Sequence, residues 1–366
     1  MATNKPSKSE TQSDTSTDHS ETVESRFTAA DRKQTVPSST ASVYNSSAEA
    51  SVHLPDSTSS KQDSLKDQTT TPPTTSLTSL NIQQGSDAAP FEDEFRFNRD
   101  IRIKHDRDSY HCLVAAMAAV SDNELVIVDY DNKSVKMVNV DNDVISSYIT
   151  FDTKPCDITT LPNREVAVTF SAEQLMRILS TTSGLSIKKS IKVSGDCLAV
   201  EYCNNYIYIS YCNPVKIQIL SLSGGVRKSI IPNSKCLEFI NMPRFIAVDI
   251  KDSSSTILYV SDWTRNTIIS MDQHGKMLAV YNDEGLVKPF DITKTPFGSI
   301  YVCNSGQGII YKMSEDLGEG LVILGQQDGL KCPHSMCFCP SRKSLYISSG
   351  LDVPNYFNFI KQFIYN

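Results

Sequence analysis

The residues Leu258-Tyr-Val-Ser-Asp-Trp-Thr-Arg-Asn-Thr-Ile-Ile-Ser-Met-Asp-Gln-His-Gly275 decide the fold. A β-prone run over 258–261 is followed by a polar break over 262–266 and a second apolar run over 267–271. The segment then ends in a turn near Gly275. Two such runs joined by a short polar loop predict a β-hairpin with a loop of about four or five residues.

The hairpin pattern recurs along the chain. Copies occupy residues 125–141, 166–182, 207–224 and 300–314, and residues 345–364 form a stretched copy. In each copy, the first apolar run ends at one landmark residue. These residues are Val128, Val168, Ile209, Val260, Val302 and Ile347, and the spacings between neighbours are 40, 41, 51, 42 and 45 positions. A period near forty with only β signals predicts blades stacked around an axis.

A second signature precedes four of the six repeats. It has the pattern Pro-x-x-apolar and begins at Pro155, Pro243, Pro289 and Pro333. Proline lacks the N–H that a sheet ladder needs, so it suits the start of a strand. A third and usually a fourth apolar stretch follow each hairpin, and the sequence therefore predicts an all-β, six-bladed propeller over residues 95–366.

The two ends of this region predict how the ring closes. Residues 96–104 form a strand without a hairpin partner beside it, and the chain ends at 359–365 with the third strand of the last blade. We expect the N-terminal strand to complete that blade, because closure removes two exposed edges.

Residues 1–94 differ sharply in composition. They contain no cysteine and no tryptophan and are rich in Ser, Thr, Asp and Lys. Such a segment buries too little apolar area to offset its chain entropy, so we predict a disordered Ser/Thr-rich tail. It holds 7 of the 35 basic and 14 of the 42 acidic residues, which leaves 28 of each sign for residues 95–366.

The chain has no apolar run near the roughly 20 residues that cross a bilayer, and its N-terminus lacks a signal pattern. We therefore expect no membrane association and a cytoplasmic location, with the nucleus as the alternative. Ten cysteines are then expected to be reduced thiols.

The repeats resemble NHL-repeat propellers, specifically the C-terminal domain of tripartite-motif (TRIM)-like proteins. The segments that carry the likeness are Val126-Ile-Val-Asp-Tyr-Asp-Asn-Lys-Ser-Val-Lys-Met-Val138 and residues 191–195, 217–225 and 258–262. Full-length relatives are ubiquitin ligases with a zinc-binding RING, a B-box and a coiled coil. Residues 1–94 offer only His19 and His53 as zinc ligands of the RING type. The resemblance therefore implies the recognition half alone, without enzyme activity or cofactor, and a monomer.

Two metal sites are weighed against structural roles. Asp157 and Asp291 recur at the start of two inner strands, where they could hold a calcium ion of a propeller hydrolase or accept backbone N–H groups. The cluster of Cys332, Cys337 and Cys339 with a nearby histidine lacks a second ligand pair for zinc. We favour strand capping for the first pair and core packing for the cysteines.

The first functional hypothesis is a non-enzymatic module that binds a partner protein through loops on one face. The candidate loops span residues 130–134, 172–174, 212–215, 263–266, 305–308 and 352–355. The candidate contact residues are Tyr130, Asp131, Asn132, Asn213, Trp263, Arg265, Asn266 and Gln307. Trp263 either packs against the neighbouring blade, which we favour, or is an exposed contact beside Arg265.

The second hypothesis is an RNA-binding propeller. The equal charge count argues against a broad basic face. A local basic patch remains as the alternative, formed by Lys133, Lys154, Arg265 and Lys288.

Overall fold

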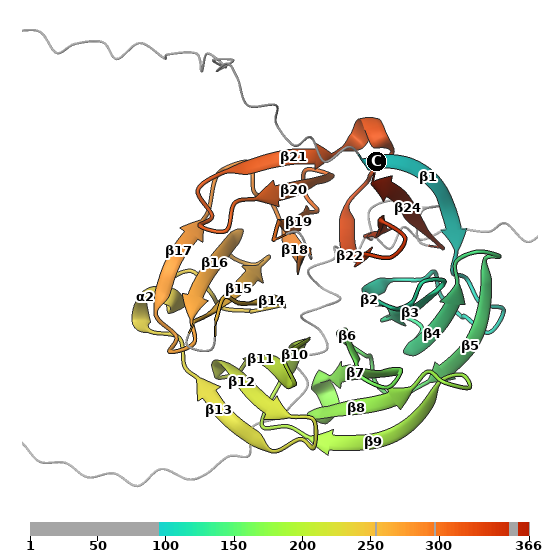
Figure 1. Cartoon of the computed structure of the whole chain (residues 1–366), viewed down its shortest axis with the longest axis horizontal. Helices are drawn as coiled ribbons and strands as arrows, with labels where there is room; N and C mark the ends of the chain where they lie inside the picture. Colours follow the sequence, from blue (N-terminus) through green and yellow to red (C-terminus); the bar gives the residue numbers. More distant parts are fainter. Residues whose placement is uncertain (1–94, 253–254, 296–297, 351–357, 366) are drawn as a thin grey trace, which may run out of the picture. The chain divides into compact units, whose positions relative to one another are not determined.

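The computed structural model describes residues 95–252, 255–295, 298–350 and 358–365. They form six four-stranded antiparallel sheets arranged around a common axis (Figure 1). The all-β, six-bladed propeller predicted from the sequence is confirmed. The tail at 1–94 and the loop at 352–355 lie outside the described residues.

Each of the first five blades uses four consecutive strands, from the axis outward. Blades 1 and 2 comprise β2 (Val114–Ser121), β3 (Glu124–Asp129), β4 (Ser134–Asn139), β5 (Val144–Thr150), β6 (Ile158–Leu161), β7 (Glu165–Phe170), β8 (Leu175–Ser180) and β9 (Ser186–Lys192). Blades 3 and 4 comprise β10 (Cys197–Cys203), β11 (Tyr206–Cys212), β12 (Val215–Ser221), β13 (Val226–Ile230), β14 (Phe245–Ile250), β15 (Thr256–Asp262), β16 (Thr267–Asp272) and β17 (Met277–Tyr281).

Blades 5 and 6 comprise β18 (Pro289–Lys294), β19 (Ile300–Asn304), β20 (Ile309–Met313), β21 (Gly320–Leu324), β22 (Pro333–Cys339), β23 (Ser344–Ser349), β24 (Phe359–Tyr365) and β1 (Phe95–Arg102). Three short helical turns, η1 (Ser171–Glu173), α2 (Ser234–Leu237) and η2 (Gln326–Asp328), lie in connections. The helix α2 falls between the third and fourth repeats and explains why their spacing is 51 residues. Among the described residues, no helix has the length and apolar character to cross a membrane.

The ring closes as predicted. β1 pairs antiparallel with β24, with Phe95 opposite Tyr365 and Ile101 opposite Ile360 (Figure 1). The sixth blade therefore joins strands from both ends of the described region, so the edge of β24 that faces away from β23 is covered.

The hairpin of residues 258–275 shows how the core forms. Successive side chains of a strand point to opposite faces of the sheet. Tyr259 packs in the cluster shared with blade 5, whereas Leu258 and Val260 pack in the cluster shared with blade 3, and all three are fully buried. Each blade is thus buried on both faces by its neighbours.

A recurring hydrogen bond ties neighbouring blades together. In four blades, the residue after the last apolar residue of the second strand carries a hydroxyl. This hydroxyl donates to a backbone carbonyl in, or just before, the inner strand of the next blade. The bonds are Thr169 to Leu198 at 2.7 Å, Ser210 to Pro243 at 2.7 Å, Ser261 to Phe290 at 2.6 Å and Ser348 to Val114 at 3.5 Å. Asp129 and Cys303 occupy this position in blades 1 and 5.

The strand order also fixes which loops share a face. In an up-and-down blade, the loop between the second and third strands and the connection to the next blade lie at the same end. We call this end the loop face. It carries the hairpin loops 130–133, 171–174 and 263–266, as well as the connections 151–157 and 231–244.

Candidate functional site

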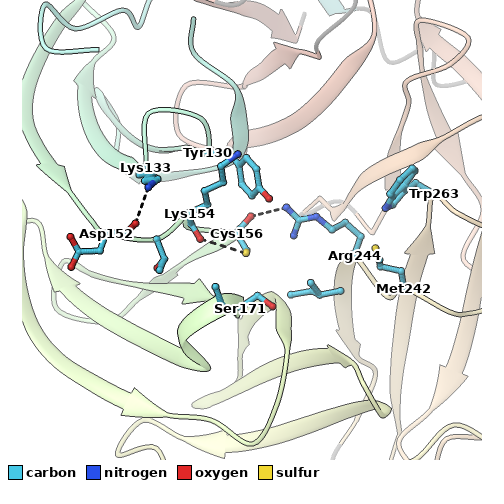
Figure 2. A pocket seen from close by; sticks show the side chains of 12 residues that line it. Tyr130, Lys133, Asp152, Lys154, Cys156, Ser171, Met242, Arg244 and Trp263 are labelled. Carbon is cyan, nitrogen blue, oxygen red and sulfur yellow. Dashed lines mark hydrogen bonds between the residues drawn. The ribbon is translucent and has the colours of Figure 1, made fainter. Parts of the chain in front are cut away.

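A pocket of about 270 Å³ opens on the loop face (Figure 2). Its walls come from the loops and strand starts of blades 1 to 4. The lining residues are Tyr130, Lys133, Asp152, Thr153, Lys154, Cys156, Ser171, Ala172, Leu198, Met242, Arg244 and Trp263. Because four blades contribute, the pocket lies where the inner strands begin near the axis.

Arg244 is the central cationic group of the pocket. It is 3 % exposed, and its guanidinium donates a 3.0 Å hydrogen bond from Nη2 to the carbonyl oxygen of Cys156 (Figure 2). Arg244 directly precedes the inner strand of blade 4, and Cys156 lies just before that of blade 2, so the bond spans blade 3. The guanidinium also lies 4.9 Å from the ring centre of Phe245. This arrangement holds a buried positive charge in a fixed position.

Two lysines stand on the blade 1 side of the pocket. Lys154 Nζ lies 4.2 Å from the ring centre of Tyr130 and forms a 3.2 Å ion pair with Asp131. Lys133 is exposed and donates a 3.0 Å hydrogen bond to the carbonyl oxygen of Asp152 (Figure 2). Their stems and the Tyr130 ring shape this wall.

Trp263 forms the opposite wall and is backed by two further rings. Trp263 is 6 % exposed and stacks on Phe290, with ring centres 5.9 Å apart. Phe290 in turn lies 4.2 Å from the ring of His334, whose Nδ1 is 3.0 Å from the carbonyl oxygen of Val114. Since a carbonyl only accepts, Nδ1 carries the proton. Burial and the nearby Arg244 charge lower the pKa of His334 to about 3, so the ring is neutral.

Three carboxyl groups lie deeper among the inner strands. Asp157 Oδ2 accepts a 2.7 Å hydrogen bond from the Val200 N–H, and Asp291 Oδ2 accepts a 2.8 Å bond from the Met336 N–H. Each aspartate thus accepts an N–H from within the inner strand of the next blade, at a shift in that strand's pairing register. Burial raises the pKa of Asp157 to about 8 and that of Asp291 to about 6. The same cause, together with Asp157, raises the pKa of Glu201 to about 8.

Asp157 and Asp291 therefore accept backbone N–H groups, as expected of a structural role, but within an inner strand rather than at its end. The other metal alternative was zinc, held by the cysteine cluster of blade 6. Cys337 and Cys339 are buried in the apolar cluster shared by blades 6 and 1, and Cys332 is only partly buried outside that cluster. The predicted core packing therefore agrees with the placement of Cys337 and Cys339 but not with that of Cys332.

One further group of potential metal ligands is already neutralised. The Asp108 and Asp129 carboxylates and the Cys112 thiol lie within 4.8 Å of one another. Lys136 Nζ sits among them, 2.6 Å from Asp108 and 2.7 Å from Asp129. A lysine ammonium thus takes the place that a cation would need, and we assign the group a structural role.

The structure gathers some of the predicted contact residues and separates others. Tyr130 and Trp263 line the pocket, and Asp131 supports it through Lys154. Trp263 is buried against Phe290, so it packs between blades and presents only part of its surface to the pocket. Lys133 and Lys154 of the predicted basic patch also line the pocket.

The remaining candidates lie elsewhere. Arg265 and Asn266 border a second depression of about 370 Å³, and Gln307 borders a third of about 350 Å³. Asn132 binds locally, with Nδ2 2.8 Å from Asp129 and 3.1 Å from the Tyr110 carbonyl oxygen. Asn213 is exposed in the β11–β12 turn. The single contact surface expected from these loops is thus divided.

Sequence reasoning missed Arg244, Met242 and Leu198. A signal for Arg244 was present, because it follows Pro243 in the Pro-x-x-apolar pattern. The equivalent positions after proline are Cys156, Phe290 and His334. In the structure these residues contact one another in two pairs, Arg244 with Cys156 and Phe290 with His334, and the first pair lines the pocket. Arg244 is the charged residue among these four, and that difference is the signal by which the sequence could have identified it.

No protein-family model and no curated protein sequence matches the chain. The structure is similar to virginiamycin B lyase from Staphylococcus aureus, with a TM-score of 0.51 and 13% identity over 75% of this chain and all of the lyase. The structure is also similar to a protein of unknown function from Bacteroides thetaiotaomicron VPI-5482. The TM-score is 0.56 and the sequence identity is 15%, over 74% of this chain and 73% of the other.

A chain of the nidogen–laminin complex gives a TM-score of 0.50 and 14% identity, over 62% of this chain and 85% of the other. At these identities the likeness shows the fold alone. The chain is a six-bladed β-propeller. None of these comparisons identifies an NHL or TRIM-like protein, so the resemblance to those families rests on the sequence segments alone.

Proposed function

We propose that the chain is a non-enzymatic recognition module that binds a partner protein on its loop face, with the pocket as the anchoring point. The observation that carries this proposal is the pocket itself. It combines the Tyr130 and Trp263 rings with the Arg244 guanidinium on a rigid ring of blades. Tyrosine, tryptophan and arginine are the residue types enriched at the energetic centres of protein interfaces.

The size of the pocket supports a protein partner. Its volume of about 270 Å³ is below the roughly 300–1,000 Å³ typical of sites for drug-sized ligands. A few side-chain atoms of a partner fill such a space, and the surrounding loops supply the rim of an interface.

The fold does not decide between binding and catalysis. Structurally similar chains include a lyase and a chain in a complex with laminin. Function must therefore be argued from the site. Asp157 and Asp291, the two carboxyl groups weighed as calcium ligands, accept backbone N–H groups of the neighbouring blades, which favours the binding role. The resemblance of the repeats to the recognition half of NHL and TRIM-like proteins points the same way.

The test is a steric block of the pocket. Ala172 is exposed and lines the pocket, so Ala172→Trp fills it without replacing a buried side chain. Ser223→Trp in the exposed β12–β13 turn is the matched control, because that turn lies on the opposite face. Full-length protein with each change is recovered from cells after cross-linking, and the bound proteins are quantified by mass spectrometry.

We expect one set of proteins to be lost with Ala172→Trp and retained with Ser223→Trp, provided that circular dichroism shows both variants folded. Equal recovery by both variants would reject the proposal. If RNA is the material that Ala172→Trp loses, and ribonuclease abolishes recovery, the RNA-binding alternative replaces it.

A further inference from the structure

The charges around the pocket are unequal. Among the described residues that line it, three carry a positive charge, Lys133, Lys154 and Arg244, and one carries a carboxylate, Asp152. This local excess contrasts with the equal count of acidic and basic residues over 95–366 as a whole. The pocket lining therefore carries more positive than negative charge, although Asp131 beside it pairs with Lys154.

The three cationic groups differ in their freedom. Arg244 is buried and fixed by the Cys156 carbonyl, and Lys154 is held over the Tyr130 ring. Lys133 is exposed at the rim and anchored only through the backbone oxygen of Asp152. A fixed, poorly hydrated guanidinium with two ammonium groups near it suits an anionic group, because charge-assisted hydrogen bonds are the strong ones.

The pocket also has an apolar part. Leu198, Met242 and Trp263 contribute their side chains to the lining, and Leu198 and Trp263 are largely buried. An occupant that matches both parts needs a negative group together with adjoining apolar atoms. An acidic residue of a peptide segment next to an apolar residue has this character.

We propose that the pocket binds an anionic side chain of a partner peptide, a carboxylate or a phosphate, with the neighbouring apolar atoms packed on Leu198, Met242 and Trp263. This inference rests on the proposed recognition function and names the chemistry of the partner. Arg244 receives the anion at the inner end, while Lys133 and Lys154 attract it at the rim.

The chain offers a matched pair of lysines for the test. Lys133 and Lys343 have left-handed φ angles of 48° and 47°. Each donates its backbone N–H to the carbonyl three residues earlier, and each accepts a 2.8 Å bond at its own carbonyl. Both are exposed, but Lys343 lies in the β22–β23 turn on the opposite face. Lys133→Glu and Lys343→Glu therefore place the same strain and the same charge change on different faces.

The probe is a random peptide library displayed on phage and selected on the immobilised full chain. The most enriched peptide is synthesised with its acidic residue intact, replaced by glutamine, or replaced by phosphoserine. Binding to the full chain is measured by fluorescence anisotropy at two salt concentrations. The carboxylate and phosphoserine peptides then show which anion the pocket prefers.

We expect acidic residues to be enriched and the glutamine peptide to bind more weakly. Lys133→Glu should weaken binding of the acidic peptide by at least about tenfold, because it places like charges together, and Lys343→Glu should leave it within about twofold. Added salt should weaken the acidic peptide more than the glutamine peptide.

The inference is overturned if selected peptides lack acidic residues, if glutamine binds as well as glutamate, or if Lys133→Glu and Lys343→Glu behave alike. Loss of binding with Ala172→Trp alongside any of these results leaves the recognition function standing. Unchanged binding with Ala172→Trp removes both proposals, because the peptide then binds elsewhere.

Discussion

Lys136 Nζ lies 2.7 Å from Oδ2 of Asp129, and both side chains are closed to solvent. Asp129 stands at the position where four other blades place a hydroxyl that bonds to the next blade, whereas in blade 1 the carboxylate forms an ion pair with Lys136 of the same blade. Burial lowers the pKa of Lys136, but the Asp129 charge and the hydrogen bonds that the ammonium donates to the Asp108 and Asp129 carboxylates more than offset this, and the net pKa is raised. The ammonium therefore stays charged inside the protein.

Replacing Lys136 by methionine should destabilise the fold strongly. The change keeps the apolar stem but leaves the Asp108 and Asp129 carboxylates buried without their cation, which costs about 3–5 kcal/mol. The free energy of unfolding in urea measures the loss. Lys361→Met is the control, since Lys361 also lies on a third strand but pairs with the half-exposed Asp100, a contact expected to contribute about 0–1 kcal/mol. Equal losses in the two variants would contradict the assignment.

The hydroxyl between blades 4 and 5 can be tested in the same way. Ser261→Ala removes the donor of the 2.6 Å bond to the Phe290 carbonyl and leaves a buried acceptor unsatisfied. We expect a loss of about 1–3 kcal/mol in the free energy of unfolding. Ser223→Ala, at an exposed turn, should stay within about 0.5 kcal/mol of the unchanged protein. If Ser261→Ala leaves the free energy of unfolding unchanged, the bond does not hold the blades together.

The raised pKa values around the axis predict a pH dependence. Glu201 and Asp157 titrate near 8 and Asp291 near 6 in the folded protein, above the usual range for unfolded chains near 4. The folded state therefore binds more protons, and stability should fall as pH rises from about 4 to about 8. Thermal unfolding between pH 5 and pH 8.5 measures this slope.

Glu201→Gln tests the origin of that slope. The amide keeps a neutral acceptor for Thr159 and removes one titrating group, so the loss of stability between pH 5 and 8.5 should shrink by about 1–3 kcal/mol, with allowance for the partial exposure of Glu201. Glu284→Gln, an exposed residue, is the control. An unchanged slope in Glu201→Gln would assign the pH dependence to other groups.

The fold could be predicted from sequence because its determinants are local and repeated. Alternation in the run from Leu258 and the proline at the start of an inner strand each act within a few residues. The pocket depends on contacts between distant repeats instead. Arg244 and Cys156 are 88 residues apart, and only closure of the ring brings them together. Tyr130 and Trp263 could be singled out as loop aromatics, whereas their convergence on one pocket could not.

The closing strand provides the last test. Ile101 on β1 is fully buried, pairs with Ile360 and packs in the cluster shared by blades 6 and 1. Ile101→Ala should lower the free energy of unfolding by about 2–5 kcal/mol, because it removes buried methyl groups at the junction of the ring. Arg96→Ala, on an exposed position of the same strand, should change it by less than about 0.5 kcal/mol. If β1 only decorates a ring that is stable without it, Ile101→Ala will unfold in urea at the same midpoint as Arg96→Ala; if β1 closes the ring, the whole propeller will unfold earlier in one transition.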